Sequence, residues 1–145
     1  MDISLRPATE DDIAFLLNLR ELTMKPYLEQ IGESTSEEAM LSRVRDNFDS
    51  ASVIEVGGIS AGIFKARYEP EYGYWFLFQL QIVPDFQNRQ LGSHLIRQLI
   101  EKAQEAGSNV RLRVYKHNPA RHLYAKLGFE KISESEFELE MQYAH

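Results

Sequence analysis

A continuous run of apolar and aromatic residues, "YWFLFQLQIV" at positions 74–83, constrains the fold of this chain more than any other segment. A strand with one face in water alternates apolar and polar residues, whereas a strand covered on both faces is apolar almost throughout. The run therefore predicts a central strand of a sheet. Directly after it, "PDFQNRQLGSHL" (84–95) passes into apolar residues at helical spacing, so a strand, a loop and a helix follow one another here.

The other segments predict further strands and helices around this unit. One helix is expected from a capping box at Thr9 to about Met24, where residues 25–34 break it, and another follows a capping box at Thr35. The helix after the loop carries an apolar stripe that starts at Leu91. A fourth helix is predicted from Asn118 at the N-cap and Pro119 at N1 to Gly128 just past its end, with Tyr124 on its apolar stripe. Further strands are predicted at 3–8, 51–56, 59–68, 110–115, 129–132 and 137–143.

The order of these elements is β-α-α-β-β-β-α-β-α-β-β, with hairpins before residue 84 and helical connections after it. Hairpins make antiparallel pairs and helical crossovers make parallel ones. The order therefore predicts an α/β fold of the mixed (α+β) kind, with a mixed sheet and helices on both faces. A length of 145 residues fits a single domain over 1–145.

Composition excludes several classes of function. The 16 basic and 22 acidic residues give a net charge of −6, which argues against a nucleic-acid partner. There are no cysteines, so disulfides, zinc–thiolate sites and a cysteine nucleophile are excluded, and the four histidines lack the spacing of a metal site. Neither a membrane-spanning run nor a signal-peptide pattern is present. We therefore expect a soluble cytoplasmic protein without metal or membrane contact.

The loop at 87–93 is a candidate anion site. A helix start offers unpaired N–H groups and the positive end of the helix dipole, and Arg89 adds a charge. An ordinary strand–loop–helix connection would have the same outline, and the loop holds one glycine, Gly92. The loop alone therefore leaves anion binding as one of two interpretations.

Two segments together resemble the GNAT superfamily of N-acetyltransferases. Residues 87–92, "QNRQLG", resemble its motif A, Gln/Arg-x-x-Gly-x-Gly/Ala, and 118–129, "NPARHLYAKLGF", match a second family segment at every fixed position. The amino-terminal "LRPATEDD" is also typical, and the order of elements agrees over nearly the whole chain. The resemblance implies a central sheet of about seven strands, splayed between the fourth and fifth strands.

The resemblance also implies acetyl-CoA as co-substrate and an amine as acceptor, with direct transfer in a ternary complex. The pyrophosphate would lie on the backbone N–H groups of the loop, and the pantetheine arm along the end of the fourth strand. An N–H near Leu80 would face the thioester oxygen as an oxyanion donor. The residues implied for the coenzyme are Leu80, Gln81, Ile82, Val83, Asn88, Arg89, Gln90, Leu91, Gly92, Ser93, Asn118 and Lys126.

Two catalytic roles follow from the same resemblance. Tyr124 would protonate the leaving thiolate, although an isolated tyrosine on this apolar stripe would be interpreted as a core residue. The amine must lose a proton to a base or a chain of waters. The family often has a glutamate early on the fourth strand, but this chain has Phe76 there. Glu71 is a candidate base, and a solvated turn carboxylate is the alternative interpretation.

Gln90 stands where the family usually has its first glycine. Glutamine is acceptable there if the residue already has the negative φ of a helical turn. We therefore expect Gln90 at negative φ, with its amide able to reach a phosphate.

The acceptor is the least specified part of the function. Tyr27, Tyr74 and Trp75 are candidates for an aromatic wall that binds the amine of a small molecule or peptide. Packing is the alternative interpretation of each. A GNAT-like domain that senses acyl-CoA or binds a protein without turnover is the second interpretation of the whole chain. A homodimer is possible, and no residue requires one.

Overall fold

The computed structural model describes residues 2–144, and their backbone divides into two compact units. The first unit is the chain up to Lys65 together with Gln79–Arg89. The second unit is Ala66–Phe78 together with the chain from Gln90 onward. The single domain predicted for residues 1–145 stays a prediction.

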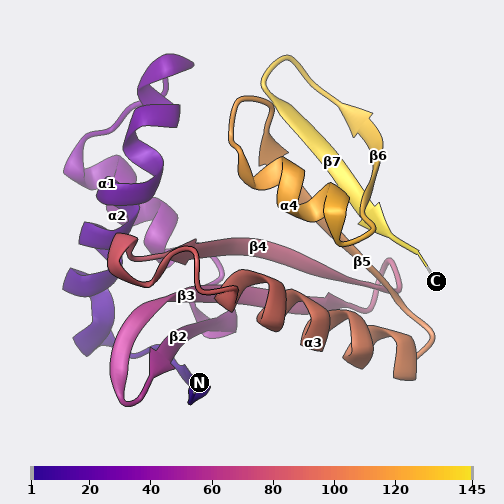
Figure 1. Cartoon of the computed structure of the whole chain (residues 1–145). Helices are drawn as coiled ribbons and strands as arrows, with labels where there is room; N and C mark the ends of the chain where they lie inside the picture. Colours follow the sequence, from indigo (N-terminus) through magenta and orange to yellow (C-terminus); the bar gives the residue numbers. More distant parts are fainter. Residues whose placement is uncertain (1, 145) are drawn as a thin grey trace. The chain divides into compact units, whose positions relative to one another are not determined.

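The first unit holds the amino-terminal strands and two helices, α1 and α2, which lie side by side (Figure 1). Its strand β1 pairs antiparallel with β2, and β2 pairs antiparallel with β3 as one of the hairpins predicted before residue 84. The elements that begin in this unit are β1 (Ile3–Pro7), η1 (Glu10–Asp12), α1 (Ile13–Gln30), α2 (Glu37–Arg45), η2 (Phe48–Ser50), β2 (Ala51–Val56) and β3 (Ile59–Glu69).

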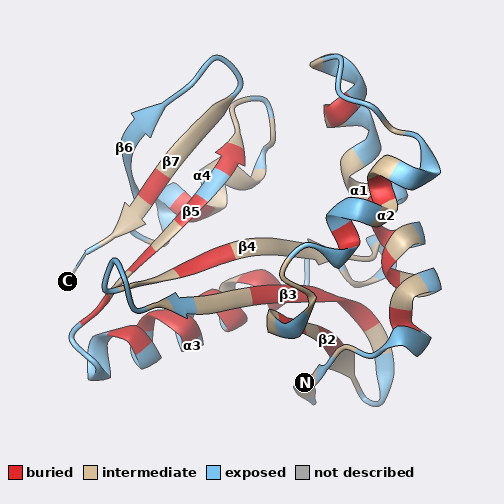
Figure 2. Ribbon diagram, turned by 180° about the vertical axis from the view of Figure 1, so that it is seen from behind, coloured by how far each residue is buried: buried red, intermediate tan, exposed pale blue. Residues whose placement is uncertain are grey.

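The second unit is built around β5, which pairs with β4 on one side and with β7 on the other. Helices α3 and α4 both contact β5, and Figure 2 shows the buried stripe of α3 and the exposed strand β6. Its elements are the first part of β4 (Tyr74–Ile82), then α3 (Leu91–Glu105), β5 (Asn109–Tyr115), α4 (Ala120–Lys126), β6 (Glu130–Glu134) and β7 (Glu138–Tyr143).

Seven strands form one sheet in the order β1-β2-β3-β4-β5-β7-β6. The β4–β5 pair is parallel, whereas the β1–β2, β2–β3, β5–β7 and β6–β7 pairs are antiparallel. The crossover helix α3 makes the parallel pairing possible, because parallel neighbours cannot be joined by a tight turn. The predicted mixed sheet of about seven strands is confirmed.

The predicted break of the first helix near Met24 is wrong, because α1 continues through Pro26 to Gln30. A proline inside a helix removes one hydrogen bond, to the carbonyl four residues earlier. That carbonyl belongs to Leu22, which is exposed, so water can satisfy it. Leu28 is buried and anchors the last turn. The helix ends where the N–H of Glu33 donates to the carbonyl of Leu28 at 2.9 Å.

The N-cap of the second helix lies one residue later than the predicted N-cap. Ser36, rather than Thr35, is the N-cap of α2, and its Oγ accepts a hydrogen bond from the N–H of Ala39 at 3.1 Å. The first predicted capping box is confirmed, because Asp12 accepts the N–H of Thr9 at 2.8 Å. Serine and threonine are both good caps, so residue type does not separate neighbouring candidates.

A buried lysine stabilises the end of α2 in the first unit. Lys65 on β3 is 1% exposed, and its Nζ donates to the backbone carbonyls of Val44 (3.2 Å) and Asp46 at the carboxyl end of the helix. Burial, assisted by the nearby charge of Arg20 and opposed by Asp46, lowers the pKa of Lys65 to about 8. A cation at a helix carboxyl end also complements the helix dipole.

We predict that the free energy of unfolding contains a term from Lys65 that increases with pH. The folded pKa of about 8 lies below the ordinary value of 10.5, so between these values the unfolded chain binds more protons than the folded one. Stability therefore rises with pH in this window, by about 1 kcal/mol per pH unit. Urea unfolding at pH 7, 8.5 and 10 should show that the free energy of unfolding of wild type increases with pH relative to that of Lys65→Met. Lys25→Met, at an exposed position, is the matched control and should follow wild type.

A constant difference between wild type and Lys65→Met across this range would contradict the lowered pKa. The variant itself should be less stable at every pH, because the carbonyls that Lys65 contacts lose their donor in a buried place.

Candidate active site

The predicted anion loop joins the end of β4 to the start of α3. After β4 comes a short 3-10 helix, η3 (Pro84–Phe86), and Gln87 fastens it by donating from Nε2 to the carbonyl of Ile82 at 2.9 Å. The guanidinium of Arg89 lies 4.9 Å from the ring centre of Phe86. Residues 87–90 are exposed, and the N–H of Gln87 is already bonded to the carbonyl of Pro84 at 3.2 Å.

The expectation of a negative φ at Gln90 is wrong. Gln90 has φ 62° and ψ 21°, the left-handed conformation, and it is the N-cap residue of α3. Asn88 has φ 64° and is also left-handed. Glycine at this position would adopt that conformation freely, whereas Gln90 adopts it at a steric cost of about 1–2 kcal/mol. No residue type in the loop indicates this, because glutamine is rare at positive φ.

The conformation of Gln90 favours an anion at the start of α3. A left-handed residue followed by a helical one turns successive N–H groups to the same side, which forms an anion-binding nest. Leu91 begins the helix and is buried, as is Gly92 behind it. The first turn of α3 contains no acidic residue that would compete for the N–H groups. These features meet the requirements of a phosphate site.

The end of β4, where the pantetheine arm is expected, is shaped by a glycine that sequence reasoning missed. A Cβ placed on Gly62 of β3 would collide with the carbonyl oxygen of Gln81, so only glycine lets the two backbones approach this closely. A lone glycine inside a strand pattern is the signal that would have indicated it. Leu80, Ile82 and Val83 are half-buried near this contact.

The pairing of β4 with β5 is short. Its register runs from Tyr74↔Asn109 to Leu77↔Leu112, so four of the nine residues of β4 are paired with β5. Beyond Leu112, β5 continues for three more residues, all of them paired with β7. The two strands thus share their amino-terminal parts alone, as the predicted splay requires.

Helix α4 follows β5 and has the start and end that the second family segment predicts. Asn118 Oδ1 accepts the N–H of Ala120 at 2.9 Å, so its side chain caps the helix, with Pro119 directly before Ala120. At the other end Gly128 has φ 108°, and the ring of Tyr143 would lie 2.8 Å from a Cβ there. Lys126 is exposed in the last turn.

Tyr124 lies on the inner face of α4 and is 7% exposed. Its ring meets Phe129 edge-on at 6.0 Å, and Phe129 in turn packs on Tyr143 at 5.8 Å. Burial raises the pKa of Tyr124 to about 12, so the hydroxyl stays protonated at physiological pH.

Glu71 lies apart from the end of the β4–β5 pairing. It is exposed in the turn that precedes β4, and β4 covers about 10 Å from Tyr74 to Leu77 at roughly 3.3 Å per residue. Phe76, at the place of the family glutamate, is 9% exposed and packs against Phe78 at 4.9 Å. The fourth strand therefore places an aromatic side chain where the family often has a base.

Two of the three candidate acceptor residues are neighbours on β4, where Tyr74 and Trp75 point to opposite faces. Tyr74 stacks on Tyr72 at 5.5 Å, whereas Trp75 meets Tyr68 at 5.9 Å. Tyr27 is a half-buried residue of α1 in the other unit.

Two further findings bear on the class of protein. Residues 2–144 contain no group of three or more histidine, aspartate or glutamate side chains placed to hold a metal ion. In the same range, none of the helices has both the length and the apolar character needed to cross a bilayer.

Comparison with known sequences places the chain in one family. The sequence model of the "Acetyltransferase (GNAT) family" matches residues 16–129, which is more than half of the chain. A search of curated proteins finds no match.

Solved structures share the fold over nearly the full length. The PaiA N-acetyltransferase of Thermoplasma acidophilum, in complex with coenzyme A, is 17% identical with a TM-score of 0.76 over 100% of both chains. An acetyltransferase from Thermus thermophilus is 22% identical, with a TM-score of 0.76 over 98% of this chain and 96% of that one. The ribosomal-protein-S18-alanine N-acetyltransferase of Escherichia coli is 18% identical, with a TM-score of 0.69 over 97% and 92%. At these identities the likeness is one of fold.

We predict that Gln90→Gly stabilises the protein. Glycine adopts φ 62° without the steric cost of a side chain, so the melting temperature should rise by a few degrees, which corresponds to about 1 kcal/mol. Asn88→Gly, at φ 64°, is the matched control, and its gain should be smaller because asparagine tolerates the left-handed region. Differential scanning calorimetry of the three proteins measures both effects. A lower melting temperature for Gln90→Gly would contradict the prediction. It would show that the contacts of the glutamine side chain stabilise the protein by more than its left-handed backbone destabilises it.

Proposed function

The chain belongs to the GNAT family of acetyltransferases, and on this premise we propose that it transfers an acetyl group from acetyl-CoA to a primary amine. The observation that carries this proposal is the state of Tyr124. The helix that bears it is capped by Asn118 as the sequence predicts, and the raised pKa of Tyr124 keeps its hydroxyl protonated. A protonated hydroxyl on this helix is able to donate to a departing thiolate.

The loop before α3 and the end of β4 are proposed to bind the coenzyme. The left-handed conformation of Gln90 and the acid-free start of α3 support a pyrophosphate on the N–H groups of residues 88–93. Residues 80–83 come after the part of β4 that pairs with β5, and they are proposed to lie along the pantetheine arm. Asn118 retains its two amide hydrogens as donors after its oxygen caps α4, and Lys126 offers an exposed cation to a phosphate.

The proposed reaction is a direct transfer. The neutral amine attacks the thioester carbonyl and a C–N bond forms. The nitrogen gives its surplus proton to water, and the C–S bond breaks with the thiolate as leaving group. Tyr124 gives its proton to that sulfur, and bulk water returns a proton to the tyrosine. An N–H near Leu80 is proposed to stabilise the charge that develops on the carbonyl oxygen.

The attacking amine must first lose a proton, and for this step we propose a chain of waters. Glu71 is the carboxylate that the sequence suggested, but its exposed place before β4 favours solvent as the immediate acceptor. Phe76 and Phe78 supply no base on the strand itself.

The acceptor is proposed to be the amine of a small molecule or of a peptide, and in either case its neutral form is the nucleophile. The alanine acceptor named for the Escherichia coli neighbour is an example of a protein amine on this fold. The second candidate function is an acyl-CoA sensor without turnover. The aromatic Phe76 in place of a glutamate is the observation that favours it.

We predict that acetyl-CoA binds in the absence of any amine and that Gly92→Val weakens this binding at least tenfold. Gly92 is buried in the first turn of α3, and a β-branched side chain would intrude between the helix start and the phosphates. Isothermal titration measures the binding, and release of free thiol with a panel of amino acids, polyamines and peptides measures turnover. Binding without turnover on every amine would favour the sensor, and normal binding by Gly92→Val would contradict the anion loop.

We predict that Tyr124→Phe lowers turnover about 10²-fold and leaves acetyl-CoA affinity and melting temperature nearly unchanged. The ring and its contact with Phe129 remain, and only the donor is lost. A coenzyme thiol has a pKa of roughly 8.5 by analogy with cysteine, so the deficit should shrink above that pH. The pKa of Tyr124, about 12, keeps the wild-type donor protonated over the whole range.

Tyr143→Phe is the matched control for this measurement. Tyr143 also packs on Phe129, at 5.8 Å, so its substitution tests the loss of a hydroxyl in the same aromatic cluster. Equal losses of turnover in the two variants would point to packing rather than to proton donation by Tyr124.

A further inference from the structure

The second unit contains a hollow of about 470 Å³ that the proposed reaction does not use. It lies where α4 faces the β6–β7 hairpin, and its volume falls within the range of small-molecule sites. Its apolar lining consists of Ala125, Phe129, Leu139 and Met141. Its polar lining consists of Lys116, Arg121, His122, Lys131 and Glu134.

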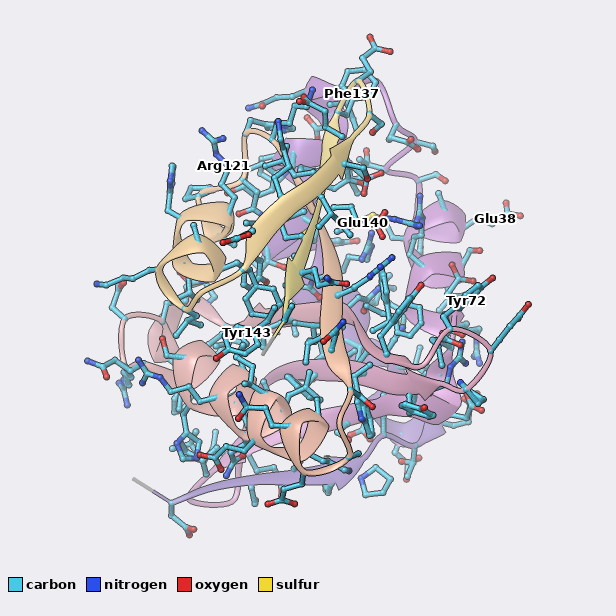
Figure 3. The ribbon with its side chains drawn as sticks, turned by 90° about the vertical axis from the view of Figure 1, so that its right-hand side faces the viewer. Glu38, Tyr72, Arg121, Phe137, Glu140 and Tyr143 are labelled. Atoms are coloured by element: carbon cyan, nitrogen blue, oxygen red, sulfur yellow. The ribbon has the colours of Figure 1, made fainter. Side chains whose placement is uncertain are left out.

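The lining residues come together through the periodicity of two elements. Arg121 and Ala125 are one helical turn apart on α4, so they share a face, and both line the hollow. Leu139 and Met141 alternate along β7 with Glu140, whose carboxylate lies 3.7 Å from Arg111 on β5 instead. Figure 3 shows Arg121 on α4 and Glu140 on β7 with their side chains directed apart.

The polar lining has an excess of positive charge. Glu134 forms ion pairs with Lys116 at 2.8 Å and with Lys131 at 2.7 Å. These two cations lower the pKa of Glu134 to about 2, so the carboxylate stays ionised. Arg121 has no ion-pair partner within the described part of the chain. Three cations face one carboxylate here, whereas the chain as a whole carries a charge of −6.

We propose that this hollow binds an organic carboxylate with an aliphatic body. The ion pairs of Glu134 show that two ammonium groups are already spaced for one carboxylate, and Arg121 adds a guanidinium that pairs with carboxylates in a bidentate way. The floor of Phe129 and Met141, 3% and 4% exposed, is apolar and offers no partner to a second charged group. A ligand with one anionic end and an apolar body therefore satisfies both parts of the lining.

Octanoate is the probe for this site, and titration calorimetry of the full chain is the measurement. Octanoate should bind at least tenfold more tightly than octan-1-ol, which has the same body without the charge, and added salt should weaken the binding. Arg121→Gln should lower octanoate affinity several-fold. Arg97→Gln, which removes the same charge from an exposed position on α3, is the matched control and should bind as wild type.

Two further variants should change octanoate affinity in opposite directions. Glu134→Gln removes the competing carboxylate from Lys116 and Lys131 and should tighten octanoate binding several-fold. Ala125→Trp places a large ring in the hollow from an exposed helical position and should abolish binding without changing a charge. Melting curves of each variant establish that it is folded before its affinity is interpreted.

Three outcomes would overturn the proposal. Equal affinity for octanoate and octan-1-ol would show that the cations take no part. Loss of octanoate binding under saturating acetyl-CoA would assign the probe to the coenzyme site, a result that leaves the proposed acetyl transfer intact. If sedimentation velocity shows a dimer, and Ala125→Trp dissociates it, the hollow would be an interface with a second copy of the chain.

Discussion

The parallel pairing of β4 with β5 is the constraint on which the proposed site depends. Two adjacent parallel strands cannot be joined by a hairpin, so the chain must return through a crossover, here the helix α3. The crossover starts at the carboxyl end of β4, and this places a helix amino terminus directly after a central strand. The place of the proposed anion loop is thus a consequence of the strand order, and the pairing of only four residues leaves the rest of β4 without β5 as a partner.

Much of this arrangement follows from local sequence. The stripe that starts at Leu91 specifies α3, and the pattern of Asn118, Pro119 and Gly128 specifies both ends of α4. These signals are strong because each depends on a single chemical property, such as apolar spacing, a side-chain acceptor or the absence of a Cβ. The mixed sheet then follows from the order of hairpins and crossovers. The features that sequence reasoning missed depend instead on distant parts of the chain. Gly62 is required by the carbonyl of Gln81 on a different strand, and although a glycine inside a strand indicates a close approach, the local sequence does not show to which partner.

The candidate site also contains residues that local sequence predicts and residues that it does not. The roles of Tyr124 and Asn118 rest on a family segment whose local geometry is reproduced, while the acceptor candidates rest on residue type alone. Strand alternation then separates Tyr74 from Trp75, since neighbouring residues on β4 face opposite sides. Gln90 has its left-handed conformation because the loop requires it there, against the preference of the residue.

The burial of Lys65 has a consequence for the proposed acetyl transfer, which uses a reactive acyl donor. Thioesters acetylate neutral amines without a catalyst, and a pKa of about 8 leaves about a tenth of such an amine neutral at pH 7, against fewer than about one in a thousand for an ordinary lysine. An exposed lysine with this pKa would be modified first. At 1% exposure, with its Nζ turned to the carbonyls at the end of α2, Lys65 is shielded from self-acetylation for as long as the first unit stays folded.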